Sequence, residues 1–301
     1  MPSCLPELRG ASAHYRTPED TSEPEELVIS WHSRIRYLGD TLRLFVGLAV
    51  LGALCLAWTA LALPLLLLLP GRRGELLGRL GIVAGFRLFI GSLRLLGLYR
   101  LDLSALRALR NAPPMVLAPN HPSVIDALLI IAHEPRVSCV MKTSLRNNLF
   151  LGAGARLAGY IRHEPPRQMI HDAIAELARG GIVLLFPEGT RTRRAPINVL
   201  QAGVGIIAKN AAVPVQTLII ETDSPYASKG WSLFRAPRFP ITCRMRLGRR
   251  FEPPADARDF TVELEAYFRD TLVGALQNQW LEERSGSRAP ATIGEDGLRA
   301  Q

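Results

Sequence analysis

A long uncharged segment near the N-terminus constrains this chain more than any other feature of its sequence. Leu44 to Leu69 are 26 residues without a charged side chain. As a helix they would be about 39 Å long, at roughly 1.5 Å per residue, whereas the hydrocarbon core of a bilayer is about 30 Å thick. The apolar core of a cleaved signal has only about 7–15 residues. An uncharged run beyond about 18 residues also favours a membrane helix over a buried soluble one. The segment therefore predicts a membrane-embedded helix.

A second apolar segment, Leu80 to Leu98, carries Arg87 and Arg94. Seven residues make nearly two helical turns, so both arginines lie on one face. This pattern predicts a helix in the membrane interface, with both guanidinium groups in the lipid phosphate layer. Gly81 and Gly85 form a small-xxx-small pair, which allows another helix to approach closely.

Basic residues flank the long segment on both sides, so the loop charges do not choose its orientation. They are Arg34, Arg36 and Arg43 before the segment, and Arg72, Arg73 and Arg79 after it. Symmetric flanks favour a re-entrant hairpin, which Pro64 would help to bend by removing a helical hydrogen bond. A single tilted span is the alternative.

Composition divides the chain into four parts. Residues 1–41 are mostly polar, include an acidic cluster and predict a flexible tail. Residues 42–100 form the membrane-associated two-helix segment. Residues 101–283 predict a folded catalytic domain, and 284–301 a disordered C-terminal tail.

Within residues 101–283, short apolar runs alternate with amphipathic stretches. This alternation predicts an α/β domain with a largely parallel core sheet flanked by helices. The expected strands are 115–118, 137–141, 182–186, 213–220 and 241–247. The expected helices are 123–133, 167–178, 199–211 and 261–281.

The charge balance indicates an anionic partner. The net charge is +9, and only three of the 36 basic residues are lysines. Nucleic acid, a phospholipid surface or a phosphorylated substrate would each fit this surplus. The apolar segment, and the lack of a basic patch interleaved with aromatic residues, argue against nucleic acid. The four cysteines are scattered without a C-x-x-C pair, so we expect neither a disulfide scaffold nor a metal site.

The first candidate motif is Asn120-His121-Pro122-Ser123-Val124-Ile125-Asp126, directly after the first expected strand. Proline is favoured at the first helical position, so we expect Pro122 to begin a helix and His121 to precede it. From there the His121 ring can fold back toward Asp126. A carboxylate on one ring nitrogen fixes the tautomer and leaves the other nitrogen as a base. The attacking hydroxyl would then come from the substrate. Alternatively, both residues only stabilise the helix end.

The second candidate motif, Phe186 to Arg191, follows a strongly apolar strand. Ligand sites in α/β sheets lie beyond the carboxyl ends of the strands. Gly189 permits close approach, Thr190 offers a hydroxyl, and Arg191 a planar fork suited to phosphate. An ordinary turn followed by solvated arginines is the alternative.

With both motifs in this order, the sequence resembles the glycerolipid acyltransferase family, whose best-known members acylate lysophosphatidic acid. The resemblance covers about residues 100–250. The N-H-x4-D block appears as 120–126, and the F-P-E-G-T-R-S-like block as 186–191 followed by Thr192 where serine is usual. Two blocks depart from the pattern. Gly159-Tyr160-Ile161-Arg162-His163 has His163 where arginine is usual, and 213–218 has Thr217 where a second proline is common.

The resemblance implies direct acyl transfer. It makes His121 the general base and Asp126 the residue that orients it. It also implies an acceptor site formed by Glu188, Gly189, Thr190 and Arg191, with Tyr160 and Arg162 from the preceding block.

The implied acceptor is a lysophospholipid, above all 1-acyl-glycerol-3-phosphate. Another lipid or alcohol acceptor remains open because two blocks depart from the family pattern. The implied donor is acyl-CoA or acyl carrier protein, with no cofactor and no metal. The expected location is the inner or cytoplasmic membrane, among membrane phospholipids, with the active site facing the cytoplasm. The rival is a non-catalytic membrane lipid-binding protein of the same fold, which would have no need of the His121 and Asp126 pair.

Overall fold

The computed structural model describes residues 31–285, so most of the expected N-terminal tail, with its acidic cluster, lies outside the described residues. A seven-stranded sheet with the order β1-β7-β6-β2-β5-β3-β4 forms the centre of the molecule. Its strands are β1 (Tyr99–Asp102), β2 (Met115–Pro119), β3 (Val137–Met141), β4 (Ile161–Arg162), β5 (Ile182–Leu184), β6 (Val215–Thr222) and β7 (Ile241–Phe251). All neighbouring strands pair in parallel except β6 and β7. The prediction of an α/β fold with a largely parallel sheet is therefore confirmed.

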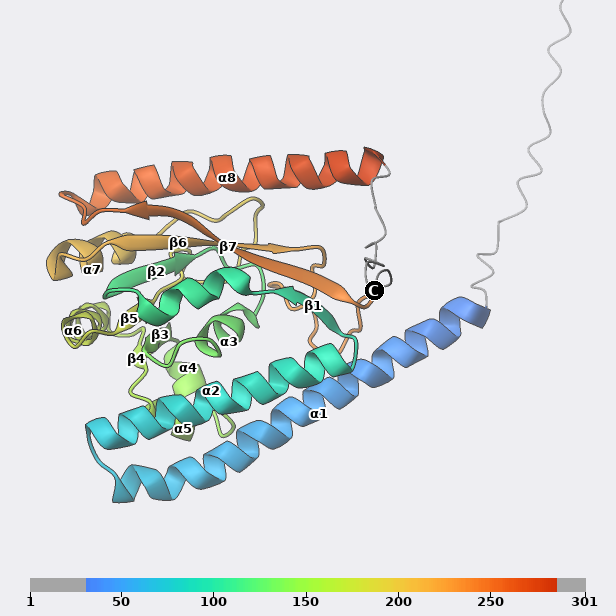
Figure 1. Cartoon of the computed structure of the whole chain (residues 1–301), viewed down its shortest axis with the longest axis horizontal. Helices are drawn as coiled ribbons and strands as arrows, with labels where there is room; N and C mark the ends of the chain where they lie inside the picture. The colour runs from blue at the N-terminus through green and yellow to red at the C-terminus, as the bar shows by residue number, and fades with distance from the viewer. Residues whose placement is uncertain (1–30, 286–301) are drawn as a thin grey trace, which may run out of the picture.

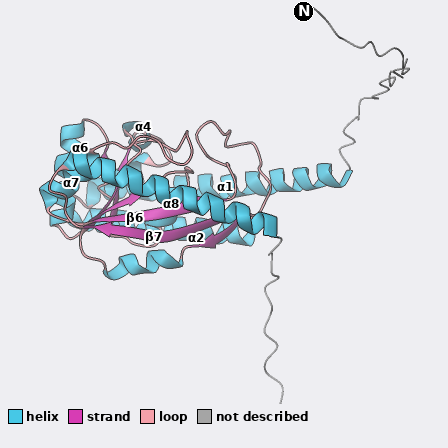
Figure 2. Cartoon of the chain, turned by 90° about the horizontal axis from the view of Figure 1, so that it is seen from above, coloured by secondary structure: helices cyan, strands magenta, loops and turns pink. Residues whose placement is uncertain are grey.

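Helices cover both faces of this sheet (Figure 1). They are α1 (Trp31–Leu68), α2 (Arg72–Leu95), the 3-10 helix η1 (Ser104–Asn111), α3 (Asp126–Ile131), α4 (Thr143–Arg146), α5 (Gly152–Leu157), α6 (Pro166–Ala178), α7 (Gly203–Ala211) and α8 (Ala257–Ser285). Successive side chains of a strand point to opposite faces. Leu117 of β2 accordingly joins the core with α2, α3 and η1, whereas Val116 joins the core with α6, α7 and α8. Viewed from above, α8 runs along β6 and β7 (Figure 2). Because both faces are covered, the central strands β2 and β5 consist of apolar residues alone.

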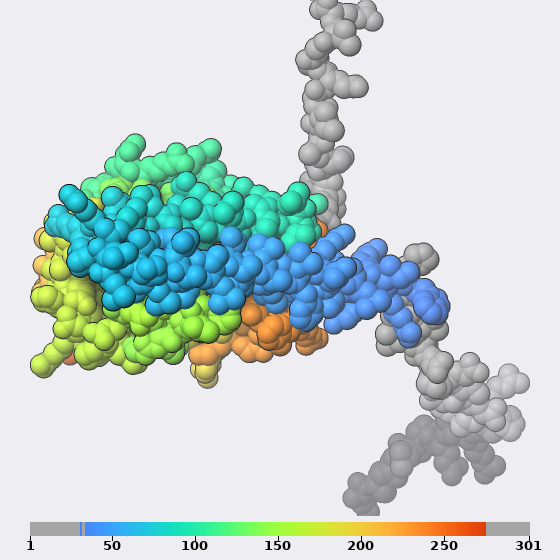
Figure 3. Space-filling view, turned by 90° about the horizontal axis from the view of Figure 1, so that it is seen from below, coloured from blue at the N-terminus to red at the C-terminus, as the bar shows by residue number. Residues whose placement is uncertain are grey.

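Helices α1 and α2 form a hairpin that lies across one face of the molecule (Figure 3). Both are long and apolar enough to cross a membrane, with mean hydropathies of 2.3 and 1.6, and only 22% of the α1 window is buried. The hairpin turns at Leu69–Gly71, where Gly71 has φ 78°, whereas Pro64 lies inside α1. The prediction that the hairpin bends at Pro64 is therefore wrong, because the chain turns after the end of α1. Helix α1 also begins at Trp31, so residues 31–41 are helical rather than part of a tail.

Arginines of α2 bond to the α/β domain. Arg87 Nε donates to the Ala132 carbonyl at 2.8 Å, and Arg79 donates to the Ala158 carbonyl and to Glu176 Oε1, at 3.0 and 2.6 Å. The expectation that Arg87 lies in the lipid phosphate layer is corrected, because the end of α3 holds its head group.

The glycine pair of α2 is half confirmed as a site of close helix approach. A Cβ on Gly81 would lie 2.0 Å from the Trp58 ring of α1, whereas a Cβ on Gly85 would meet nothing within 4 Å. Trp58 therefore fills the space that the missing Gly81 side chain leaves.

Candidate active site

The N-H-x4-D segment leaves the carboxyl end of β2 at the centre of the sheet. The Asn120 side-chain amide accepts from Ile220 N at 2.7 Å and donates to Ile220 O at 2.9 Å, which ties the segment to β6. Helix α3 begins at Asp126, so the prediction that Pro122 begins the helix is wrong. Backbone N–H groups of the turn bond to other partners, Ser123 N to Asp126 Oδ2 at 2.7 Å and Val124 N to Ala227 O at 3.1 Å.

The predicted contact between His121 and Asp126 is present. His121 Nδ1 lies 3.0 Å from Asp126 Oδ2, and the two side chains are 15% and 1% exposed. Burial raises the pKa of Asp126, while the bond to His121 opposes this shift. A carboxylate at Nδ1 favours the tautomer that carries its proton there, which leaves Nε2 free to accept a proton.

The Glu188 side chain links the second motif to the first by hydrogen bonds. Its Oε1 accepts from His121 N at 3.0 Å and from Thr192 Oγ1 at 2.8 Å, and its Oε2 accepts from Asn198 N at 3.0 Å. Thr192 N in turn donates to the His121 carbonyl at 2.8 Å. Burial raises the pKa of Glu188, and these donors oppose the rise. Since Glu188 is 3% exposed and both oxygens accept from the protein, it positions the His121 backbone.

Phe186 supports the His121 ring from one side. The two rings stack with their centroids 3.8 Å apart and their planes 22° apart. His121 is therefore held at three points. Phe186 contacts its ring face, Asp126 contacts its Nδ1, and Glu188 accepts from its backbone N–H.

The expected acceptor residues follow Glu188 in a tight turn. Gly189 has φ 63°, in the left-handed region that favours glycine, and a Cβ there would lie 2.5 Å from the Gln201 amide, which would have to move. Thr190 Oγ1 accepts from Lys229 Nζ at 2.8 Å. Arg191 Nη1 donates to the carbonyls of Ala227 and Ser228, at 2.8 and 3.0 Å.

A third segment, residues 226–229, completes the site and has no counterpart among the sequence motifs. The Ala227 carbonyl accepts from Val124 N of the first motif and from Arg191 of the second. Ala227 has φ 59°, which is costly for any residue with a Cβ. The scarcity of lysine was the one signal in the sequence that could have drawn attention to Lys229.

Tyr160 and Arg162 are not brought to His121. Tyr160 is 5% exposed in the core with α2 and α5, and its hydroxyl has no hydrogen-bond partner within residues 31–285. Burial raises the pKa of that hydroxyl. Arg162 ends the edge strand β4, and β5 and β3 separate that strand from β2. The roles of Tyr160 and Arg162 at the acceptor stay predictions.

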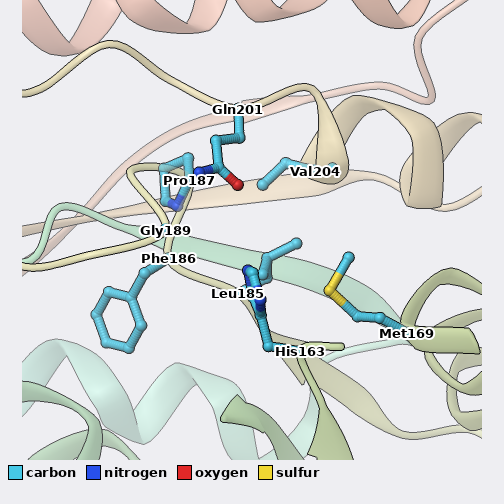
Figure 4. A pocket seen from close by; sticks show the side chains of 9 residues that line it. His163, Met169, Leu185, Phe186, Pro187, Gly189, Gln201 and Val204 are labelled. Atoms are coloured by element: carbon cyan, nitrogen blue, oxygen red, sulfur yellow. The ribbon is translucent and has the colours of Figure 1, made fainter. Parts of the chain in front are cut away.

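A pocket lies behind the second motif, lined by His163, Met169, Leu185, Phe186, Pro187, Gly189, Gln201, Gly203 and Val204 (Figure 4). The Phe186 ring points away from its centre. The pocket has a volume of about 20 Å³, which holds about one water molecule and is too small for a lipid head group. Among residues 31–285, no three His, Cys, Asp or Glu side chains are grouped to hold a metal ion.

Comparisons with known proteins agree with this geometry. A model of the Acyltransferase family matches residues 100–221, which include both motifs. The chain is 25% identical over 178 residues to a 1-acyl-sn-glycerol-3-phosphate acyltransferase from Pseudomonas aeruginosa, covering 55% of this chain and 67% of that protein. Its fold is similar to the crystal structure of the 1-acyl-sn-glycerophosphate (LPA) acyltransferase PlsC from Thermotoga maritima. The TM-score is 0.61 at 17% identity, over 85% of this chain and 99% of the other.

Proposed function

We propose that this chain is a glycerolipid acyltransferase and that it acylates the hydroxyl of a lysophospholipid at a membrane surface. The match to the Acyltransferase family model, the similarity to a 1-acyl-sn-glycerol-3-phosphate acyltransferase and the similar fold of a solved acyltransferase support this proposal. The acceptor is 1-acyl-glycerol-3-phosphate, the donor is acyl-CoA or acyl carrier protein, and the product enters phospholipid biosynthesis. The observation that carries this proposal is the 3.0 Å contact between His121 Nδ1 and a buried Asp126, in a ring that keeps 15% of its surface exposed.

The proposed reaction is a direct attack by the acceptor. His121 Nε2 takes the proton of the lipid hydroxyl while that oxygen attacks the thioester carbonyl. Asp126 stabilises the imidazolium that forms. The carbon–sulfur bond then breaks, and the departing thiolate receives the proton from His121. The scheme needs no acyl-enzyme, cofactor or metal.

The acceptor's phosphate is proposed to bind at Thr190 and Arg191. Arg191 Nη1 donates to two backbone carbonyls, whereas Arg191 Nε and Nη2 have no hydrogen-bond partner among residues 31–285. These remaining donors are suited to a phosphate oxygen. Gly189 keeps the turn tight, and Glu188 holds the turn against His121.

The apolar hairpin supports a membrane location. Moving an acyl chain into water costs about 0.8 kcal/mol per CH₂. An enzyme held at the interface by α1 and α2 leaves the chains of acceptor and product in the bilayer. We place the site on the cytoplasmic side of the inner or cytoplasmic membrane, where the thioester donors are made.

An activity screen tests this function. Detergent-solubilised protein is offered labelled acyl-CoA or acyl carrier protein with a panel of lysolipids. His121→Ala is expected to lower kcat/KM by about 10²–10⁴, the usual contribution of a positioned base. His171→Ala, on an exposed histidine of α6, is the matched control. Normal turnover by a folded His121→Ala protein contradicts the base role. Lipid binding without turnover by the wild type favours the lipid-binding alternative.

A further inference from the structure

Lys229 contacts the expected acceptor site from outside the family motifs. It lies beyond residues 100–221, which the family model matches, in the loop between β6 and β7. Its Nζ donates to Thr190 Oγ1 at 2.8 Å. An ammonium group has three N–H donors, so this bond leaves two for another ligand.

The backbone before Lys229 is held in place at an energetic cost. Ala227 has φ 59°, a left-handed conformation that is unfavourable for a residue with a Cβ. Arg191 donates to the carbonyls of Ala227 and Ser228, and Val124 N donates to Ala227 as well. Both motifs of the site therefore fix the position of Lys229.

Lys229 also belongs to a group of cations without acidic partners. Loss of solvation and the charges of Arg193, Lys142 and Arg191 lower its pKa. In the described part of the chain, none of these four side chains forms an ion pair with Asp or Glu. Four neighbouring cations repel one another, and an anion with more than one charge would relieve that repulsion.

We propose that Lys229 binds the phosphate of the acyl acceptor, between that phosphate and the Thr190 hydroxyl. This inference rests on the proposed function, and it adds a residue that distinguishes phosphate monoesters from other head groups. The donor's phosphates have the same chemistry. The acceptor is favoured because Lys229 bonds to Thr190, while Ala227 bonds to the segment that carries His121.

Acceptor and donor kinetics with Lys229→Met and Lys229→Arg test the proposal. For Lys229→Met we expect the KM for 1-acyl-glycerol-3-phosphate to rise about ten- to hundredfold, since a hydrogen bond to a charged group is worth about 1.5–3 kcal/mol. The KM for the donor and for monoacylglycerol, which has no phosphate, is expected to stay unchanged. Lys229→Arg keeps the charge and is expected to restore most of the loss. Lys209→Met is the control, because Lys209 is exposed in the last turn of α7, which leads into the amino end of β6, whereas the site lies at the carboxyl ends of the strands.

Each other outcome overturns the inference. A rise in the donor KM assigns Lys229 to the donor's phosphates. An equal loss with monoacylglycerol, or a lower melting temperature in Lys229→Met alone, makes Lys229 a structural residue. A wild-type protein without turnover of any phosphorylated acceptor refutes the proposed function itself, and is seen before any variant is made.

Discussion

At the scale of single residues, the site depends on one buried carboxylate more than on any exposed group. Asp126 Oδ2 contacts both His121 Nδ1 and Ser123 N, at 3.0 and 2.7 Å. One oxygen therefore holds the imidazole and the turn that carries it. Because Asp126 is 1% exposed, no solvent molecule can take over both bonds when the carboxylate is removed.

Asp126→Asn is expected to lower kcat without a matching rise in either KM. The amide keeps the size of the carboxylate, but its NH₂ group can donate to Nδ1 and so favour the tautomer with its proton on Nε2. A base in the wrong tautomer cannot accept the acceptor's proton, so kcat should fall by about 10²–10⁴. Steady-state kinetics against both substrates measures the effect. Asp172→Asn alters an exposed His–Asp pair on α6 and serves as the control. A folded Asp126→Asn protein with normal kcat would remove Asp126 from the mechanism.

How far the sequence predicts these residues depends on how far apart they lie in the chain. His121 and Asp126 are five residues apart, so local geometry suffices to predict their contact. The start of α3 was predicted wrongly because Val124 bonds to Ala227, about a hundred residues later. Lys229 was missed for the same reason, since no periodic pattern links it to Thr190. The burial of Tyr160 in the core with α2 and α5 was not predicted, because no strand or motif signal connects those helices to it.

At the scale of elements, the α/β core was predictable and the short edge strands were not. The five expected strands contain apolar or alternating runs, and each appears with shifts of its ends. Strand β1 includes the charged residues Arg100 and Asp102 among its four residues, and β4 has only two residues, so neither shows an apolar run that indicates a strand. The contact between the hairpin and the catalytic domain was also absent from the prediction. It depends on backbones that touch at glycines, and a lone glycine in a helix does not reveal its partner.

Helix α2 meets the end of α5 at Gly78 without a side chain between the two backbones. A Cβ on Gly78 would lie 2.5 Å from Ala158 N and 2.6 Å from the Leu157 carbonyl carbon. Both atoms are backbone, so no rotamer change can make room. Gly85 lies two turns further along α2, where a Cβ would meet nothing within 4 Å.

Gly78→Ala and Gly85→Ala are therefore expected to act in opposite directions. Overpacking at Gly78 should destabilise the protein by about 1–3 kcal/mol. Alanine at Gly85 should stabilise it by up to about 1 kcal/mol, because alanine is the better helix former. Thermal unfolding of the two variants and the wild type in one detergent gives the comparison. Equal melting temperatures for the two variants would show that α2 does not rest on α5 in solution.

At the scale of the whole molecule, the two faces of the sheet differ in what they present to the surroundings. Helix α8 covers one face, and its side chains Phe260, Leu264 and Phe268 are buried against the sheet. The hairpin lies across the other face (Figure 3), and many of its large apolar side chains are exposed. At its turn, Leu67 and Leu68 are 85% and 73% exposed. Many exposed large apolar side chains on one hairpin are typical of a membrane or protein contact.

The hairpin tip is expected to bind neutral bilayers independently of salt. At 1 M NaCl the Debye length is about 3 Å, so the attraction of a net charge of +9 to lipid head groups is screened, whereas apolar burial is not. Wild-type protein should therefore float with phosphatidylcholine vesicles at 1 M NaCl. The double variant Leu67→Glu/Leu68→Glu should lose at least about tenfold in partitioning, because a charge within the bilayer costs about 2.5–3.5 kcal/mol at its centre and less near its edge. Val262→Glu replaces a 72% exposed side chain of α8 on the opposite face and should float normally. Release of the wild type by salt would show an electrostatic attachment instead. Normal flotation of the double variant would place the hairpin turn outside the bilayer.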